Sequence, residues 1–251
     1  VARFESDGLA LPLPHSTPRE PDRFVAALRA RFILSALTDA DFLDTEGHFN
    51  SEQSTRRTNP ALRESTALEL LLSTLAAKTS DTELSQLRTE LLHACLDRAE
   101  SPTGLFTLTA PTGSGKTLAS LAFALRHIEH HNRSFAPDDP RRLRRIIIVI
   151  PYTSIIEQTA RIFRSLFSSN FGDDYVLEHH ANIAPSAERS TPAERDAEEI
   201  RARRARLAAE NWSAPIVVTT NVRFFESLFA HKPAACRRLH ARNLLAAGDG
   251  N

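Results

Sequence analysis

Apolar positions along the chain follow two different spacings, which predict two kinds of element. A spacing of three to four residues predicts helices that begin near residues 22, 60, 80 and 191 and helices that span 118–131, 154–166 and 222–230. Short apolar runs predict strands over 105–109, 146–150, 175–177 and 215–220. The run 146–150 is entirely β-branched, which is typical of a strand buried on both faces of a parallel sheet. Because strands and helices alternate after residue 100, we predict an α/β fold.

The region before residue 100 is predicted to be helical, with polar connections. Four apolar side chains of its first helix lie near one face: Phe24, Leu28, Leu34 and Leu37. Residues 47–59 are polar and are expected to form a loop. Residues 80–83 (Ser-Asp-Thr-Glu) fit a capping box, in which the serine and the glutamate satisfy free N–H groups at a helix start. An all-helical segment is therefore expected to precede the α/β part.

The segment from Ala110 to Thr117 (APTGSGKT) has the pattern of a phosphate-binding loop between an expected strand and an expected helix. Gly113 and Gly115 let backbone N–H groups curl around an anion, and the helix N-terminus adds positive potential. Lys116 would hold the outer phosphates of a nucleotide, and the Thr117 hydroxyl would ligate Mg²⁺. Ala110 stands where the general pattern has its first glycine. The predicted nucleotide-binding residues are Pro111, Thr112, Gly113, Ser114, Gly115, Lys116 and Thr117.

Composition narrows the class of protein without selecting a ligand. The 251 residues are 41% hydrophobic and 25% charged, which is ordinary for a globular protein, and the formal net charge is zero. A basic surface for nucleic acid would therefore have to be local. Two distant cysteines fit a reducing, cytoplasmic setting, and no apolar run approaches membrane-span length. The chain contains no methionine, and we expect it to be an internal piece of a longer protein.

Three motifs, in order, resemble the first lobe of superfamily 2 helicases. Residues 110–117 are similar to motif I, residues 149–158 (VIPYTSIIEQ) to motif Ia, and residues 216–221 (IVVTTN) to a later strand-and-threonine motif. The surrounding segments resemble, more specifically, the CRISPR-associated helicase–nuclease family of type I systems. These segments are 105–109 (LFTLT), 122–125 (AFAL), 211–215 (NWSAP), 224–229 (FFESLF) and 236–240 (CRRLH).

The resemblance implies a RecA-like parallel sheet, here an incomplete first helicase lobe, after the end of an HD nuclease domain. The expected domains are 1–58 for the end of the HD domain, 59–100 for a helical connector and 101–251 for the lobe. Asp41, within the stretch SALTDADFLDTE, best matches the last metal-binding aspartate of the family's HD domain. The family's Walker B motif should follow His240 but is not evident in the sequence. We therefore expect this fragment alone to bind nucleotide with little hydrolysis.

The same resemblance implies ATP hydrolysis coupled to movement along single-stranded DNA. Its cofactors would be ATP with Mg²⁺ and a divalent metal in the nuclease domain, with Lys116 and Thr117 as catalytic residues. Gln86 and Arg88, upstream of the loop, are the candidates for adenine recognition, and Arg88 is the one that we predict to bind nucleotide. Hydroxyls at the carboxyl ends of strands can hold DNA phosphates, and the candidates are Thr153, Thr219 and Thr220. The implied partner is the RNA-guided Cascade complex of antiviral defence, with no membrane involved.

Other interpretations stay open. Asp41 also fits an exposed or salt-bridged position at the end of a helix, and strand-end threonines are commonly turn residues. His127 and His131 are four residues apart but lack a third metal ligand, and the neighbours His179 and His180 should point to opposite faces of a strand. The whole chain also fits another P-loop NTPase, a superfamily 2 helicase of another pathway, or a nucleotide-binding module without catalysis.

Overall fold

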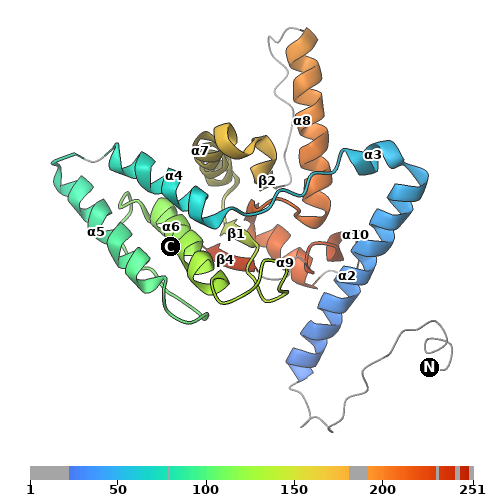
Figure 1. Ribbon diagram of the computed structural model, residues 1–251, viewed down its shortest axis with the longest axis horizontal. Helices are drawn as coiled ribbons and strands as arrows, with labels where there is room; N and C mark the ends of the chain where they lie inside the picture. The colour runs from blue at the N-terminus through green and yellow to red at the C-terminus, as the bar shows by residue number, and fades with distance from the viewer. Residues whose placement is uncertain (1–22, 79, 181–191, 230–231, 241–243, 249–251) are drawn as a thin grey trace.

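Four parallel strands form the centre of the molecule. The computed structural model describes residues 23–78, 80–180, 192–229, 232–240 and 244–248. The strands are β1 (Arg145–Ile150), β2 (Val176–His179), β3 (Ile216–Thr220) and β4 (Leu244–Gly248). They lie in the order β2-β3-β1-β4, with helices packed around them (Figure 1). The predicted α/β fold with a parallel sheet is thereby confirmed.

Helices supply the rest of the described secondary structure. They are α2 (Arg23–Phe49), α3 (Ser51–Thr55), α4 (Glu64–Ala76), α5 (Glu83–Arg98), α6 (Lys116–Asn132), α7 (Thr153–Phe171), the 3₁₀ helix η1 (Asp173–Tyr175), α8 (Pro192–Asn211), α9 (Asn221–Phe229) and α10 (Pro233–Cys236). The predicted loop over 47–59 contains the short helix α3, because the side chain of Asn50 accepts a hydrogen bond from the Gln53 N–H and caps it. In the described part of the chain, no helix is long and apolar enough to cross a membrane.

The register of the sheet brings the carboxyl ends of the strands to one edge. Val149 of β1 pairs with Thr219 of β3 on one side and with Gly248 of β4 on the other. Thr219 in turn pairs with His179 of β2. The residues that follow these positions therefore emerge together, which is where parallel sheets of α/β proteins build their sites.

Alternation along β1 gives the sheet two buried faces. Ile146, Ile148 and Ile150 pack into a core with α4, α6 and α7, whereas Ile147 packs on the opposite face against Trp212 near the end of α8. All four isoleucines are at most 4% exposed. The expected burial of this strand on both faces is confirmed, since helices cover each side.

The predicted strand over 105–109 is wrong. This segment has no strand structure, and the side chain of Leu105 is 95% exposed. Phe106 instead packs edge-on against Phe123 and His127 of α6. A strand needs a neighbouring backbone for its hydrogen bonds, and none of the described strands pairs with this segment. The apolar residues of this segment therefore pack it against α6 without forming a strand.

The start of α5 lies two residues later than the capping box predicted. The N-cap is Thr82, whose hydroxyl accepts a hydrogen bond from the N–H of Ser85 at 3.3 Å. The Ser85 hydroxyl accepts from the N–H of Ser80 at 3.0 Å. Only half of a capping box forms, because the Ser85 side chain reaches the N–H of Ser80 and not that of the N-cap Thr82.

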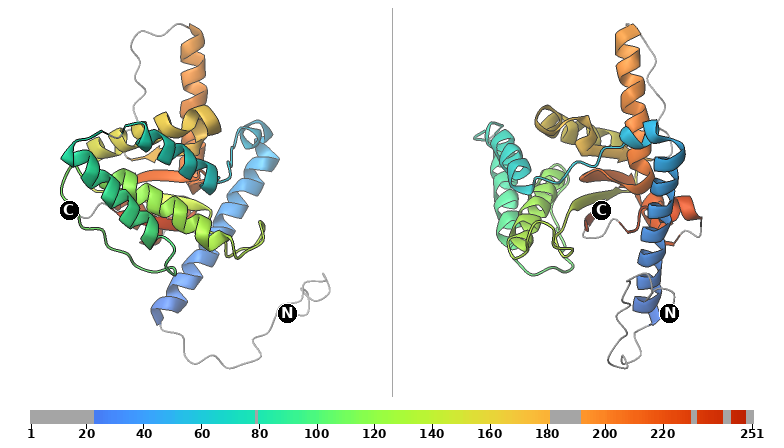
Figure 2. Two further views of the ribbon diagram at one scale, coloured as in Figure 1. Left: turned by 60° about the vertical axis from the view of Figure 1, so that its left-hand side comes forward. Right: turned by 45° about the vertical axis from the view of Figure 1, so that its right-hand side comes forward.

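Helix α2 runs along one side of the molecule, and its first turns extend beyond the remaining helices (Figures 1 and 2). Its buried residues are polar, namely Ser35 and Asp39. The four apolar side chains that share a face, Phe24, Leu28, Leu34 and Leu37, are between 45% and 85% exposed. Polar contacts therefore hold this helix against α10, because its apolar stripe faces away from the described core.

Candidate functional site

The turn from Ala110 to Thr117 leads directly into the first residue of α6. Gly113 has a φ of 83° and Gly115, the N-cap of α6, has a φ of 84°. Residues with a Cβ pay roughly 1–2 kcal/mol for this left-handed conformation. A Cβ at Gly115 would also approach the Arg88 side chain at 3.4 Å, whereas at Gly113 it would meet nothing within 4 Å. The backbone shape therefore requires both glycines.

Several polar donors gather in this turn. The Ser114 side chain is 1% exposed, and within the described part of the chain its hydroxyl has no hydrogen-bond partner. The Lys116 ammonium donates to the carbonyl of Ala110 at 3.0 Å, which holds it inside the turn. Left-handed residues beside right-handed ones direct successive N–H groups to one side, and the helix start adds positive potential. This donor set suits a phosphate group.

Oxygen donors for a divalent cation also lie at the start of α6. Thr117, its second residue, is partly exposed beside Lys116. Mg²⁺ prefers oxygen ligands and is commonly held by one protein oxygen together with the nucleotide phosphates. The Thr117 hydroxyl and the unpartnered hydroxyl of Ser114 are groups of that kind. The residues present therefore fit a nucleotide carried with Mg²⁺.

Arg88 contacts the phosphate-binding turn directly. Its Nε and Nη2 atoms donate to the carbonyl of Gly113 at 3.2 and 3.0 Å, across 25 residues of sequence. The side chain comes from α5, so this contact ties α5 to the turn in front of α6. The structure places the predicted adenine-binding residue at the loop backbone, and adenine recognition by Arg88 stays a prediction.

The three threonines at the carboxyl edge of the sheet have different surroundings. Thr153, the first residue of α7, is exposed. Thr220 is partly exposed, and its hydroxyl accepts a hydrogen bond from the N–H of Arg223 at the start of α9. Thr219 is fully buried and donates to the carbonyl of His179 at 2.8 Å, which links β3 to β2. A DNA contact by Thr219 would require that bond to open, whereas Thr153 is already accessible.

The histidines of α6 do not converge. His127 is 1% exposed, and its Nδ1 lies 2.8 Å from the carbonyl of Ala99. His131 places its Nε2 3.1 Å from the carbonyl of Arg141. Each imidazole therefore has a different backbone partner.

The neighbours His179 and His180 point to different partners, as strand alternation predicts. Nδ1 of His179 accepts a hydrogen bond from Nε1 of Trp212 at 3.0 Å, whereas Nε2 of His180 lies 2.8 Å from Glu178. Burial, together with the positive charges of Arg238 and Arg223, lowers the pKa of His179 to about 3. His179 is therefore a neutral core residue.

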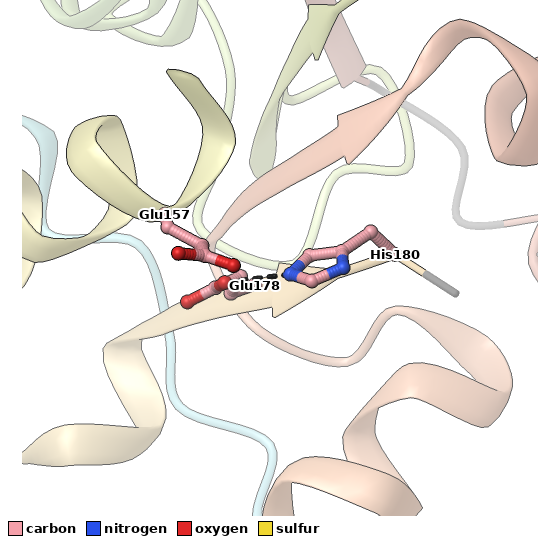
Figure 3. Close-up of side chains that lie close together, drawn as sticks. All are labelled: Glu157, Glu178 and His180. Carbon is pink, nitrogen blue, oxygen red and sulfur yellow. Dashed lines mark hydrogen bonds and ion pairs between the residues drawn. The ribbon is translucent and has the colours of Figure 1, made fainter. Parts of the chain in front are cut away.

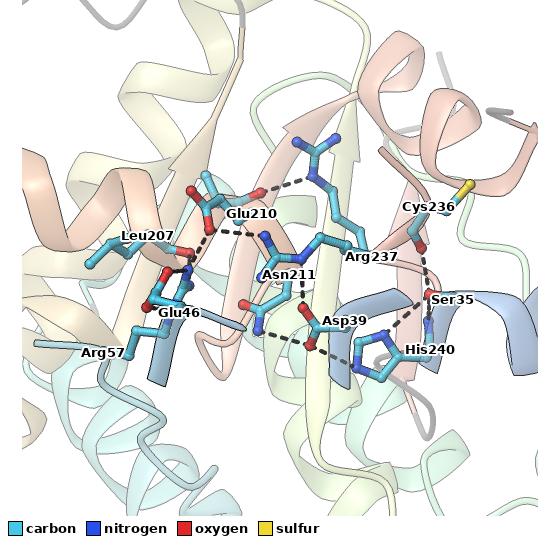
Figure 4. Close-up of polar contacts among 12 residues, drawn as sticks. Ser35, Asp39, Glu46, Arg57, Leu207, Glu210, Asn211, Cys236, Arg237 and His240 are labelled. Atoms are coloured by element: carbon cyan, nitrogen blue, oxygen red, sulfur yellow. Dashed lines mark hydrogen bonds and ion pairs between the residues drawn. The ribbon is translucent and has the colours of Figure 1, made fainter. Parts of the chain in front are cut away.

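The buried acid of α2 is Asp39, and Asp41 is exposed. Asp39 accepts a hydrogen bond from Nε of Arg237 at 2.7 Å and from Nδ2 of Asn211 at 3.2 Å, and it lies 3.3 Å from Nε2 of His240 (Figure 4). Glu210 also pairs with Arg237, at 3.1 Å. The partners come from α8 and from the segment around α10, so this cluster fastens α2 to the sheet domain.

Hydrogen bonding sets the ionisation of this cluster. Burial opposes the charge of Asp39, but the hydrogen bonds from His240, Arg237 and Asn211 outweigh it and lower the pKa to about 2. The Arg237 guanidinium lies 4.7 Å from the centre of the Phe42 ring, which adds a cation–π contact. Sequence reasoning missed this cluster, because Asp39 and Arg237 are 198 positions apart.

Among the residues that the structure describes, Asp41 belongs to no group of three potential metal ligands. The one group of three potential metal ligands found among them lies elsewhere, at Glu157, Glu178 and His180. A divalent ion needs several convergent ligands. Any metal at Asp41 would thus require ligands from outside the described residues, and the role of Asp41 stays a prediction.

A curated relative shares part of this sequence. It is the protein described as CRISPR-associated nuclease/helicase Cas3 from Haloferax volcanii, which is 34% identical over 128 residues. The match covers 49% of the present chain and 13% of the relative. The chain therefore corresponds to a small part of that protein's length, and the resemblance to CRISPR-associated helicase–nucleases that its motifs indicate is confirmed over that part.

A family comparison covers a longer stretch. The matching family is described as DEAD/DEAH box helicase, and the match runs from residue 90 to residue 244. This range includes the phosphate-binding turn, motif Ia and the strand-and-threonine motif around β3. Since the match extends over more than half of its length, the chain belongs to the DEAD/DEAH box helicase family.

Proposed function

We propose that this chain binds ATP with Mg²⁺ at residues 111–117 and couples nucleotide binding to contact with single-stranded DNA. The observation that carries the proposal is the turn before α6, where two left-handed glycines, a buried unpartnered serine hydroxyl and a lysine ammonium converge. Membership of a helicase family supports ATP as the nucleotide and nucleic acid as the second ligand.

Each residue of the turn has a separate task in this proposal. The ammonium of Lys116 would exchange the Ala110 carbonyl for oxygens of the outer phosphates, and the Ser114 hydroxyl would gain the acceptor that it lacks. Mg²⁺, held through Thr117, would neutralise charge on the phosphates. Phosphoryl transfer to water depends mostly on positioning and charge stabilisation, so these contacts supply the protein's part on this side of the nucleotide.

The DNA-binding surface in this proposal is the carboxyl edge of the sheet. Thr220 ends β3, and Thr153 begins α7 three residues after the end of the neighbouring strand β1, whose Ile150 pairs with Thr220. Hydroxyl groups and backbone N–H groups can hold phosphates without reading bases. A contact of this type suits an enzyme that moves along DNA of any sequence.

Our proposal for the wider biological role is supported by the similarity to the Haloferax volcanii protein and not by the geometry of the site. The printed name of that protein joins a helicase to a nuclease and to CRISPR. We propose that a longer protein containing this chain acts in CRISPR defence as a single-strand DNA translocase with an HD nuclease, recruited by the Cascade complex. The exposed carboxylate of Asp41 is the position at which the nuclease part of this proposal can be tested.

DNA binding is tested by fluorescence anisotropy of a labelled oligonucleotide with ATP and Mg²⁺ present. Thr153→Ala should weaken binding on the order of tenfold, since a hydrogen bond to a charged phosphate contributes about 1.5–3 kcal/mol. The matched control is Thr55→Ala, which removes an exposed threonine from α3. Equal affinity of the Thr153→Ala variant, the control and the unmodified chain would contradict a DNA contact at this edge.

A further inference from the structure

Three side chains with metal-binding atoms, none of them from the phosphate-binding turn, meet beside the sheet. Glu157 belongs to α7, Glu178 to β2, and His180 follows β2 by one residue. One ligand atom of each lies within 4.8 Å of the others. Figure 3 shows the two carboxylates and the imidazole directed toward the same space. Two separate elements thus contribute to one cluster.

The local fold explains why these residues converge. Positions 178 and 180 are two residues apart, so their side chains lie on the same side of the extended backbone. Helix α7 packs on β2 and β3, and Glu157 lies in its second turn. The backbone between Glu178 and His180 is held by the hydrogen bond that the Thr219 hydroxyl donates to the His179 carbonyl. The cluster therefore stands on rigid elements.

Burial distinguishes this cluster from a group of surface acids. The His180 side chain is only 2% exposed and that of Glu178 15% exposed, whereas Glu157 is exposed. His180 and Glu178 contact each other through Nε2 and Oε1 at 2.8 Å. The buried imidazole fixes one side of the cluster, and the exposed Glu157 leaves the other side open to solvent.

A further contact orients the Glu178 carboxylate. Arg164 of α7 donates from Nη1 to the Oε2 atom at 2.9 Å, while the other oxygen, Oε1, faces His180. Ligating carboxylates in metal sites are commonly held in this way by an outer partner on one oxygen. Glu178 therefore has one oxygen fixed by the protein and one that is directed into the cluster.

We propose that Glu157, Glu178 and His180 form a binding site for a divalent transition-metal ion of the zinc class. Zn²⁺ is bound by imidazole nitrogen and carboxylate oxygen at roughly 2.0–2.2 Å, so ligand atoms within 4.8 Å of one another need only small side-chain movements to close on it. The imidazole favours Zn²⁺ or Co²⁺ over Mg²⁺, Ca²⁺ or Mn²⁺, which prefer oxygen ligands.

The three ligands leave a coordination position for water or another small ligand. Sites with three protein ligands and one open position are the usual form of reactive zinc sites, whereas structural sites have four protein ligands. The open position would lie on the side of the exposed Glu157, near the carboxyl edge of the sheet. This site is separate from the nucleotide turn, so it neither requires nor excludes ATP binding.

Zinc titration of the full chain tests the site. The chelator-treated protein should bind one equivalent of Zn²⁺ in competition with a chromophoric chelator. Glu157→Gln should weaken that binding roughly tenfold and His180→Ala roughly hundredfold or more, because each removes one of three ligands. Glu157 is exposed, so its variant keeps the fold and decides the test if His180→Ala does not fold.

Matched control variants come from α5, where Glu90 and His93 are exposed. Glu90→Gln and His93→Ala should bind Zn²⁺ as the unmodified chain does. Co²⁺ in place of Zn²⁺ should give the visible absorption of a four-coordinate ion, and Glu157→Gln should change that spectrum. The proposal is overturned if the unmodified chain binds no stoichiometric Zn²⁺. Affinity that is unchanged in Glu157→Gln, or lowered only in the α5 variants, would overturn it equally.

Discussion

The phosphate-binding turn and the buried cluster around Asp39 are both built from polar groups, but those groups are used in opposite ways. In the turn, the Ser114 hydroxyl has no partner among the described residues, and Lys116 contacts a single carbonyl. Around Asp39, both carboxylate oxygens have partners, and Arg237 has two acidic ones. The turn keeps donors available for a ligand, whereas the cluster neutralises its charges within the protein.

The difference separates residues that bind from residues that hold the fold. A buried charge whose partner is removed is costly, whereas a donor that waits for a ligand contributes little to stability. The Asp39 cluster has incomplete pairing too, since Asn211 Oδ1 and Arg237 Nη2 have no hydrogen-bond partner among the described residues. The Phe42 ring faces the Arg237 guanidinium. Substitutions in the two regions should therefore affect different measurements.

The largest expected effect is on stability, from Arg237→Met. Its side chain is 5% exposed, and its removal leaves Asp39 buried without its main partner. The cost should be about 3–5 kcal/mol of unfolding free energy. Urea unfolding followed by fluorescence of the single, buried Trp212 measures it. The control Arg56→Met removes an exposed pair with Glu52 and should cost less than about 1 kcal/mol. Equal losses of unfolding free energy in Arg237→Met and Arg56→Met would contradict a stabilising role that is particular to the Asp39 cluster.

Lys116→Ala should change ligand binding and leave stability nearly unchanged. A hydrogen bond to a charged phosphate contributes about 1.5–3 kcal/mol, so nucleotide affinity should fall on the order of tenfold to hundredfold. Titration with a fluorescent ATP analogue measures the change, and Lys78→Ala, at an exposed lysine after α4, is the matched control. A marked loss of stability with unaltered affinity would place Lys116 among the structural residues.

Acid should weaken the Asp39 cluster selectively. The pKa of Asp39 is about 2 in the folded chain against an ordinary value of 3.8, so the unfolded chain binds more protons between these values. Stability contributed by Asp39 is present above pH 3.8 and is lost as pH falls toward 2, by about 2 kcal/mol in total. The difference in unfolding free energy between Asp39→Asn and the unmodified chain should shrink over that window. A constant difference would show that the carboxylate is not stabilised.

The smallest expected effect is that of Arg88→Gln. This change removes the two bonds to the Gly113 carbonyl, and nucleotide affinity should fall a few-fold, because a loosened turn must be ordered by the ligand. Calorimetric titration with ATP and Mg²⁺ measures it, with Arg56→Gln, at a partly exposed arginine, as the control. A loss as large as that of Lys116→Ala would mean that Arg88 contacts the nucleotide itself.

Local sequence was sufficient for the phosphate-binding turn and insufficient for the Asp39 cluster. All predicted residues of the turn lie within eight consecutive positions, so their geometry follows from the backbone of one turn and one helix start. Asp39 finds Arg237 across 198 positions, and only the packing of α2 on α10 brings them together. Asp41 lies on the exposed side of α2, because the buried side of this helix is the polar one that carries Ser35 and Asp39.

The strand predictions also failed where the outcome depended on contacts with distant parts of the chain. β1 and β3 could be read from their β-branched runs, since buried parallel strands have little room for polar residues. The segment 105–109 (LFTLT) also contains apolar and β-forming residues, but no described strand pairs with it. For the metal cluster, the spacing of Glu178 and His180 was visible in the sequence. Its third member, Glu157, depended on the packing of α7.

The most direct test of the account is to observe the two left-handed glycines of the turn when nucleotide is added. The chain has eight glycines, so selective ¹⁵N-glycine labelling gives a simple amide spectrum. ATP with Mg²⁺ should shift the resonances of Gly113 and Gly115, leave those of Gly47 and Gly172 in place, and have much less effect in Lys116→Ala. Unchanged Gly113 and Gly115 resonances at nucleotide concentrations that saturate binding would contradict a phosphate site in this turn.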